Sequence, residues 1–147
     1  MKKLIALILS VALCLSVMAP ALADQPAGPS VAIVVAGTLG DRSFYDSANE
    51  GRLKLEADLG LSTTVIECRE DGSQYENALV TAAESYDVVV AVGWQFWDAL
   101  VEVVPQMPDT KFIFIDNAMD EIPENMLCVT YKENEGSFLA GYIAMKL

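Results

Sequence analysis

The sequence contains no histidine, and this absence narrows the chemistry open to the chain. Without histidine, the usual Ser-His and Cys-His forms of nucleophilic catalysis are excluded. Only three cysteines occur, and their positions match no spacing of metal ligands. The segment 37–40 reads Gly-Thr-Leu-Gly, which fits neither the P-loop nor the dinucleotide-binding pattern. We therefore expect no enzyme, no resident metal and no cofactor.

Basic residues are also scarce. Nine Lys and Arg stand against 21 Asp and Glu, which gives a net charge of −12. Nucleic-acid binding is not expected, because neutralising phosphates requires clusters of Lys and Arg. The excess of carboxylates is explained either by a well-solvated surface or by an acidic docking face.

The one long hydrophobic run lies at the N-terminus and has the pattern of a secretory signal peptide. Lys2 and Lys3 precede an apolar stretch at 4–17, and a small-x-small cleavage site follows at 21–23. The run is too short for a comfortable membrane span. Cleavage removes both lysines and lowers the net charge from −12 to −14. We expect an exported chain.

Lipid anchoring is the less favoured alternative for this leader. Cys14 lies inside the apolar stretch and follows Leu13, whereas a lipoprotein signal needs a small residue directly before its cysteine. Residues 1–23 are therefore interpreted as a cleaved signal peptide and 24–30 as a flexible leader with two prolines. Residues 31–147 form the predicted folded part.

Strand and helix patterns alternate along the folded part. Apolar, β-branched runs without polar alternation are typical of strands buried on both faces of a parallel sheet. The predicted strands are 31–36, 63–67, 88–92, 111–115 and 126–130. The predicted helices are 44–59, one starting at a Ser73–Glu76 capping box, 95–104 and 135–147. The fold class is α/β, a doubly wound, mostly parallel five-stranded sheet of order 2-1-3-4-5.

Two further expectations follow from this sheet order. Cys68 and Cys128 belong to opposite edges of the sheet, so we expect two separate, largely buried thiols rather than a disulfide. The last predicted helix mixes large apolar residues with Gly136, Ala140 and Gly141, which permit close backbone approach. We expect this helix to pack tightly.

Polar and aromatic residues gather at the carboxyl ends of three predicted strands. In this sheet order the three ends lie side by side, where open α/β sheets bind ligands. Carboxylates accept hydrogen bonds from hydroxyl or ring N–H groups, and an aromatic ring offers a flat apolar face. The candidate ligand-binding residues are Asp41, Ser43, Phe44, Gly93, Trp94 and Asp116.

Most of these candidates also have a structural interpretation. Asp41 is equally suited to capping the helix that begins at residue 44, and Phe44 to packing in the core. Trp94 and Trp97 are consistent with packing of a first helical turn. Asp116 is the strongest single candidate, because a plain turn does not explain its alignment with the other two strand ends.

Four stretches of the sequence resemble a known family. They read VAIVVAG followed by GDRSFYDSANEG, then SYDVVVAVGWQFWDAL, PDTKFIFID and VTYKENEGSFLAGYIA. These stretches are similar to the basic membrane protein (BMP) family of ABC-transporter substrate-binding proteins, which includes purine nucleoside receptors. The similarity extends over 31–147. It implies the N-terminal lobe of a type I periplasmic-binding fold, in which two α/β lobes close over a ligand.

The resemblance also implies a function. The chain would capture a small molecule, a nucleoside above all, for a membrane permease and its ATPase at the outer side of the plasma membrane. By matching position, Asp41 and Phe44 would contact the ligand, with Phe44 stacking on a base. Gly93 would lie at the crevice, and Asp116 would bind the base or sugar hydroxyls.

Two points remain open at this stage. The sequence stops where the chain is expected to cross into a second lobe, so we expect a truncated product or a fragment. The alternative functions are a receptor or sensor module for a sugar or other small metabolite, and a small secreted α/β hydrolase using Asp41 and Asp116.

Overall fold

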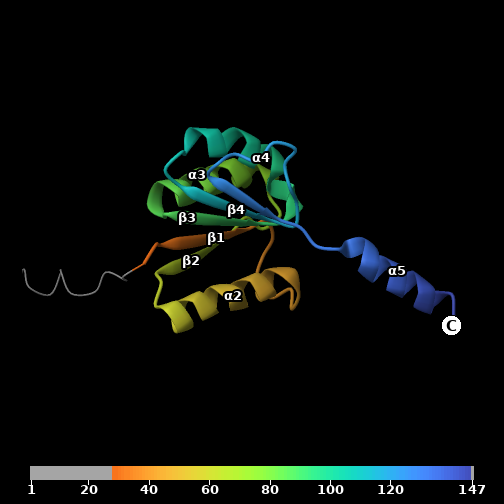
Figure 1. The fold of residues 1–147 in the computed structure, drawn as a ribbon. Helices are drawn as coiled ribbons and strands as arrows, with labels where there is room; N and C mark the ends of the chain where they lie inside the picture. Colours follow the sequence, from red (N-terminus) through yellow and green to blue (C-terminus); the bar gives the residue numbers. More distant parts are fainter. Residues whose placement is uncertain (1–27, 147) are drawn as a thin grey trace, which may run out of the picture.

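Five short strands pair in parallel, with helices on both faces of the sheet and a further helix beyond it (Figure 1). The computed structural model describes residues 28–146. The predicted signal peptide, the alternative lipid anchor at Cys14 and most of the predicted leader lie outside this range. The strands are β1 (Val31–Val35), β2 (Thr63–Glu67), β3 (Val88–Val92), β4 (Lys111–Ile115) and β5 (Met126–Val129).

The predicted sheet order is confirmed. The order is β2-β1-β3-β4-β5 and every pairing is parallel, so β3 is central and the more polar β2 lies at an edge. The register places Val35 beside Val92, Val92 beside Ile115, and Ile115 beside Val129. Four strands therefore end at the same level.

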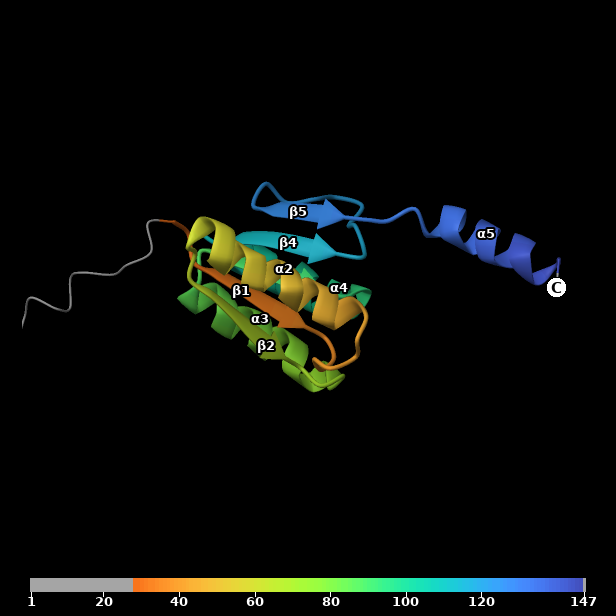
Figure 2. The ribbon, with the colours of Figure 1, turned by 90° about the horizontal axis from the view of Figure 1, so that it is seen from below.

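The two faces of the sheet are covered unequally. Helices α3 (Tyr75–Ser85) and α4 (Trp97–Val103) lie on one face, and α2 (Phe44–Leu59) lies on the other (Figures 1 and 2). The main core lies under α3 and α4. Its largest fully buried side chains are Phe96, Phe112, Phe114, Leu79 and Leu100.

The α2 side has a smaller core. Its buried residues are Ile33, Val35 and Val92, and Phe44 and Ala48 of α2 pack against them. No residue of α2 is fully buried. Leu59, the last residue of α2, is 66% exposed.

The predicted capping box at the second helix is wrong. The Ser73 hydroxyl does not accept from the helix; it donates to the Asp71 carboxylate at 2.6 Å. Asp71 also accepts from the Ser73 N–H at 3.0 Å and from the Gln74 side chain at 2.8 Å. These bonds, those from the Ser73 and Gln74 side chains first, lower the pKa of Asp71. A 3₁₀ turn, η2 (Gly72–Gln74), therefore precedes α3.

The predicted helix at 95–104 is divided into three pieces. A 3₁₀ turn, η3 (Trp94–Phe96), leads into α4, and a second one, η4 (Val104–Gln106), follows it. Pro105 lies inside η4, where its missing N–H removes a helical hydrogen bond. The first and last strands are each one residue shorter than predicted.

The last helix does not pack as expected. Helix α5 (Glu133–Ala144) begins two residues earlier than predicted, and none of its residues is buried. It extends away from the sheet beyond the end of β5 (Figures 1 and 2). The prediction of tight packing is therefore wrong for the part of the chain that the structure describes.

The two described cysteines are free thiols, as predicted. Cys68 follows the edge strand β2 and is 1% exposed, whereas Cys128 lies in the opposite edge strand β5 and is half-buried. Burial raises the pKa of the Cys68 thiol to about 11. Because the thiolate is the reactive form, both burial and the raised pKa protect the Cys68 thiol from reaction.

We predict that the two thiols react in separate phases. With a chromogenic disulfide reagent at pH 8, the chain from Asp24 onwards reacts first at Cys128, and Cys68 reacts only at the rate of unfolding. Cys128→Ser removes the early phase and Cys68→Ser leaves it intact. Two rapid phases, or no reaction before reduction, would contradict the placement of the thiols.

Candidate functional site

The loops that follow β1, β3 and β4 leave the sheet from one edge. Backbone hydrogen bonds continue past the strand ends: Ala36 N–H donates to Val92, Gly93 N–H to Ile115, and Asp116 N–H to Val129, at 3.3, 3.2 and 2.9 Å. Gly93 and Asp116 therefore follow neighbouring strands at the same level. We call residues 37–44, 93–95 and 116–117 the rim.

Asp41 caps the start of α2. Its carboxylate accepts from the backbone N–H groups of Ser43, Tyr45 and Asp46 at 3.0, 3.1 and 3.1 Å. Desolvation opposes the effect, but these backbone bonds together lower the pKa of Asp41. The hydrogen bonds of Asp41 are therefore those of a helix cap, which is one of the two interpretations of this residue. The side chain is nevertheless exposed, so its remaining lone pairs can accept from a ligand.

Two other carboxylates hold the same loop. Asp46 accepts from the N–H groups of Gly40 and Arg42 at 2.7 and 2.8 Å. Glu67, at the end of β2, accepts from the N–H of Leu39 at 2.9 Å. The loop after β1 thus has a defined shape, although most of it is exposed.

Ser43 and Phe44 have different environments. Ser43 is exposed, and its hydroxyl makes no cap hydrogen bond to α2. Phe44 is half-buried against the smaller core, with its ring centroid 5.5 Å from that of Tyr45. Phe44 also lines a groove of about 410 Å³ on the α2 face, together with Ile115 and Tyr131. Part of its ring therefore packs against the smaller core.

Gly93 has a backbone that favours glycine. Its φ of 121° lies in the left-handed region, and a Cβ there would lie 2.5 Å from the side-chain oxygen of Gln95. The sharp turn places Trp94 at the rim, where it is 60% exposed. Trp97 is half-buried, with its ring 6.5 Å from that of Phe114, so it packs on the core side.

Asp116 combines an unusual backbone with an unpaired side chain. Its φ is 77°, a left-handed conformation that few residues other than glycine adopt and that asparagine and aspartate tolerate best. Within residues 28–146, no side-chain or backbone group donates a hydrogen bond to its half-buried carboxylate. Strained backbone of this kind concentrates at functional sites.

Two close contacts within the rim loops are not evident from the sequence. The ring of Tyr45 occupies the space in which Gly37 would carry a side chain, and Gln95 approaches Gly93 in the same way. Burial raises the pKa of the Tyr45 hydroxyl. Among residues 28–146, no group donates a hydrogen bond to the buried side-chain oxygen of Gln95. Gln95 belongs to the rim, and Tyr45 directly follows its first segment.

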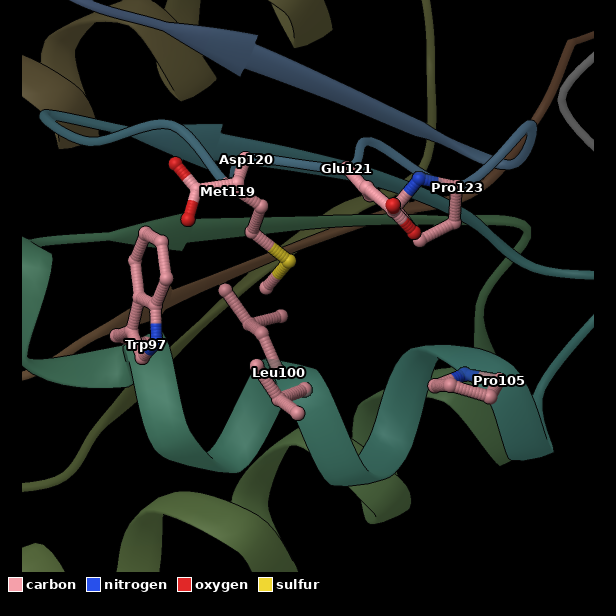
Figure 3. Close-up of a pocket in the computed structure, with 8 residues that line it drawn as sticks. Trp97, Leu100, Pro105, Met119, Asp120, Glu121 and Pro123 are labelled. Atoms are coloured by element: carbon pink, nitrogen blue, oxygen red, sulfur yellow. The ribbon is translucent and has the colours of Figure 1, made fainter.

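One groove in the described part of the chain lies away from the rim. It measures about 490 Å³ and lies between α4 and the β4–β5 connection, where Met119 points toward Trp97 and Leu100 (Figure 3). Neither this groove nor the one beside Phe44 is lined by Asp41, Gly93 or Asp116. These three rim residues therefore belong to neither groove.

Residues 28–146 contain no group of three or more His, Cys, Asp or Glu arranged to hold a metal ion. No helix among them combines the length and apolar character needed to cross a membrane.

Comparison with known proteins identifies the family. A family profile described as ABC transporter substrate-binding protein, PnrA-like, matches residues 29–147. The chain belongs to the Bmp family. The resemblance seen in the sequence is thus confirmed, and the family is one of solute-binding proteins.

Relatives are found in several bacteria. Basic membrane protein A of Borreliella burgdorferi is 32% identical over 121 residues, which cover 81% of this chain and 35% of that protein. The CD4+ T-cell-stimulating antigen of Listeria monocytogenes is 34% identical over 113 residues, covering 74% and 31%. The Bmp chain described here thus spans about a third of the length of these relatives.

Solved structures share the fold. A solute-binding protein of an ABC transporter system from Aeropyrum pernix K1 superposes with a TM-score of 0.72 at 30% identity, covering 78% of this chain and 31% of that one. A lipoprotein fragment from Peptoclostridium difficile 630 gives a TM-score of 0.64 at 27% identity, covering 81% of this chain and 98% of the fragment. A piece of about this length has therefore been crystallised.

We predict that Gly93→Ala destabilises the chain by about 1–3 kcal/mol, because it combines a positive φ with a collision against Gln95. Gly51→Ala is the matched control, since nothing lies within 4 Å of its added Cβ. Because Gly51 lies in the interior of α2, Gly51→Ala should stabilise the folded chain by about 0.5–1 kcal/mol. Urea unfolding measures both; equal effects would contradict the described backbone at Gly93.

We predict a pH-dependent contribution from Asp41. Its pKa in the folded chain lies below the ordinary value of 3.8. The stabilisation is therefore fully present above pH 3.8 and is lost as the pH falls through the lower folded value. Asp41→Ala should melt at a lower temperature than the parent chain at pH 7, and the difference between their melting temperatures should shrink only below pH 3.8. Asp58→Ala, at the other end of α2, is the control; a difference unchanged at the lowest accessible pH would contradict this role.

Proposed function

We propose that this chain is the ligand-binding lobe of an exported solute receptor, which captures a purine nucleoside for uptake by the permease and ATPase of an ABC transporter. Membership of the Bmp family supports the receptor function. The observation that carries the proposal is the rim: three loops, from β1, β3 and β4, leave the sheet side by side.

The chemistry of the rim suits a neutral ring compound with hydrogen-bond donors. Asp116 presents a carboxylate with no partner among the described residues, and Asp41 keeps free lone pairs in an exposed position. Both accept from sugar hydroxyls or from ring N–H groups. Trp94 adds an exposed aromatic face on which a base can stack. Gly93 lets the backbone approach the ligand closely.

Phe44 contributes less to this proposal than the family resemblance implies. The resemblance assigns it to stacking on the base, yet its ring is half-buried against the smaller core. We propose that Trp94 provides the main stacking face and that Phe44 supports it from the α2 side. Ser43, exposed beside them, is a further polar contact for the ligand.

Because the rim is open, we expect this chain to bind its ligand weakly. In a two-lobed receptor the ligand is held from both sides, whereas here the rim contacts it from one. Losing about half of the contacts weakens binding by several kcal/mol, which moves a micromolar ligand into the millimolar range. Binding by this chain should therefore be measured by a method suited to weak complexes.

Export is part of the proposal. The N-terminal pattern predicts a cleaved signal, and a related fragment is described as a lipoprotein. We propose a location on the outer side of the plasma membrane, where such receptors meet their permease. A cleaved leader is favoured over a lipid anchor at Cys14 because Leu13 precedes that cysteine.

We predict weak but localised nucleoside binding. In ¹H–¹⁵N correlation spectra of the chain from Asp24 onwards, adenosine, inosine or guanosine at millimolar concentration shifts the amides of 41–44, 93–94 and 116. Asp116→Ala weakens binding about tenfold to a hundredfold, as expected for the loss of a charge-assisted hydrogen bond worth about 1.5–3 kcal/mol. Asp120→Ala, four residues further on in the same connection, leaves binding unchanged.

The same titration separates the alternative functions. Ribose shifting the rim amides as strongly as the nucleosides would favour a sugar receptor and contradict the nucleoside assignment. Chromatography of the nucleoside samples after incubation tests for free base. Turnover lost in Asp116→Ala would favour the hydrolase and contradict a receptor that leaves its ligand unchanged.

A further inference from the structure

Gly93 is covered in this structure, although the proposed function uses it as a point of close approach for the ligand. Gly93 is buried, whereas Trp94 beside it is 60% exposed. The side-chain oxygen of Gln95 lies 2.5 Å from the position that a Cβ of Gly93 would take, and the Cβ of Ala36 lies 3.5 Å from that position. Of these two neighbours only the Gln95 side chain can rotate away, because a Cβ is fixed to its backbone. Access to Gly93 therefore depends on the position of Gln95.

The Gln95 carboxamide is satisfied at one end only. Burial raises the pKa of the Tyr45 hydroxyl, and a hydrogen bond with the Gln95 side chain opposes that rise. The side-chain oxygen of Gln95, by contrast, has no donor in the described part of the chain. Because this oxygen is buried, a group elsewhere in the protein reaches it only if the side chain moves. Leaving a buried acceptor unpaired is unfavourable, so a position that supplies a donor is favoured once a donor is present.

A carboxamide is complementary to the edge of a purine base. Its nitrogen donates two hydrogen bonds and its oxygen accepts, so it presents a donor and an acceptor side by side. Purine edges carry the matching pair, an N–H donor next to an acceptor, and Gln or Asn recognises adenine through two such hydrogen bonds. Trp94, the proposed stacking face, directly precedes Gln95. A base stacked on Trp94 therefore lies next to a side chain with an unused acceptor.

We propose that Gln95 is a specificity-determining residue of the rim, which covers Gly93 when no ligand is bound and turns outward to pair with the edge of a purine base. The turn uncovers Gly93 and gives the Gln95 oxygen the donor that it lacks. Until then the hydrogen bond with Tyr45 holds the covering position. This inference rests on the proposed nucleoside function and names a residue that reads the base.

A purely structural role for Gln95 leads to a different expectation. If the side chain only supported the loop after β3, its removal would weaken the binding of every nucleoside by the same factor. If it reads the base edge, its removal abolishes the preference for bases that carry an N–H donor at that edge. The ratio of two dissociation constants therefore distinguishes the two roles, whereas a single affinity does not.

The first test compares two ribonucleosides that differ at the base edge. Inosine carries a ring N–H donor beside a carbonyl acceptor, and purine riboside lacks both groups. In ¹H–¹⁵N titrations of the chain from Asp24 onwards, inosine should bind about tenfold more tightly than purine riboside. Gln95→Met, which keeps the length of the side chain, should reduce this ratio to about one. Gln106→Met, in η4 and outside the rim, is the control and should leave the ratio unchanged.

The second measurement uses the parent chain alone, so it does not depend on whether Gln95→Met folds, which circular dichroism checks separately. In the complex with inosine, nuclear Overhauser effects should connect the side-chain amide protons of Gln95 with the H2 proton of the base. This proton lies next to the ring N–H that the Gln95 oxygen is proposed to accept from. Purine riboside should give no such effects at the same degree of saturation.

The outcomes separate this inference from the proposed function. Equal affinities of the parent chain for inosine and purine riboside would overturn the role of Gln95 and leave the receptor function standing. The same conclusion would follow if Gln95→Met weakened both ligands alike, if it preserved the ratio, or if the Gln95 amide showed no contact with bound inosine. If no nucleoside shifted the rim amides, the proposed function would fail and this inference would fail with it.

Discussion

The parallel register of the sheet is the constraint on which the rest of this structure depends. Because Val35, Val92, Ile115 and Val129 lie at one level, the loops that follow their strands leave from the same edge. The ladder of hydrogen bonds extends one residue beyond the strands and holds Gly93 and Asp116 in place. Segments more than seventy residues apart in the chain thereby become neighbours. The same geometry sends α5 outward from this edge, since it follows β5 after only three residues.

The rim is built from carboxylates with two different tasks. Asp46 and Glu67, with most of the capacity of Asp41, hold the backbone of the loop after β1. Asp116 has no such task among the described residues, and its backbone adopts an unfavourable conformation. A rim of this composition favours neutral molecules that donate hydrogen bonds and disfavours phosphates. The negative charge of the rim therefore supports a nucleoside rather than a nucleotide as the proposed ligand.

Local patterns in the sequence were sufficient to predict the sheet. The strands are β-branched runs, and their alternation with helical patterns leads to the order that the structure shows. The errors arise where a neighbour or a distant contact decides the outcome. Asp71, two residues before Ser73, takes the hydrogen bonds expected of a capping box. Helix α5 has the composition of a packed helix, but composition does not specify which surface it meets.

The candidate site, too, was predicted only in part from the sequence. The strand ends that carry Gly93, Trp94 and Asp116 follow from the strand pattern together with the sheet order. The contact of Tyr45 with Gly37 and that of Gln95 with Gly93 depend on how each loop folds back on itself. No local sequence pattern specifies such contacts. The division of Phe44 between core and rim is likewise a property of the packed sheet.

We propose that three loops at one sheet edge form a single ligand-binding rim. Hydrogen–deuterium exchange with and without saturating adenosine tests it most directly. The account predicts slower exchange in 37–44, 93–97 and 116–117 together, with no change in 119–123 beside the groove under α4. Protection confined to that groove, or to one loop without the other two, would contradict it.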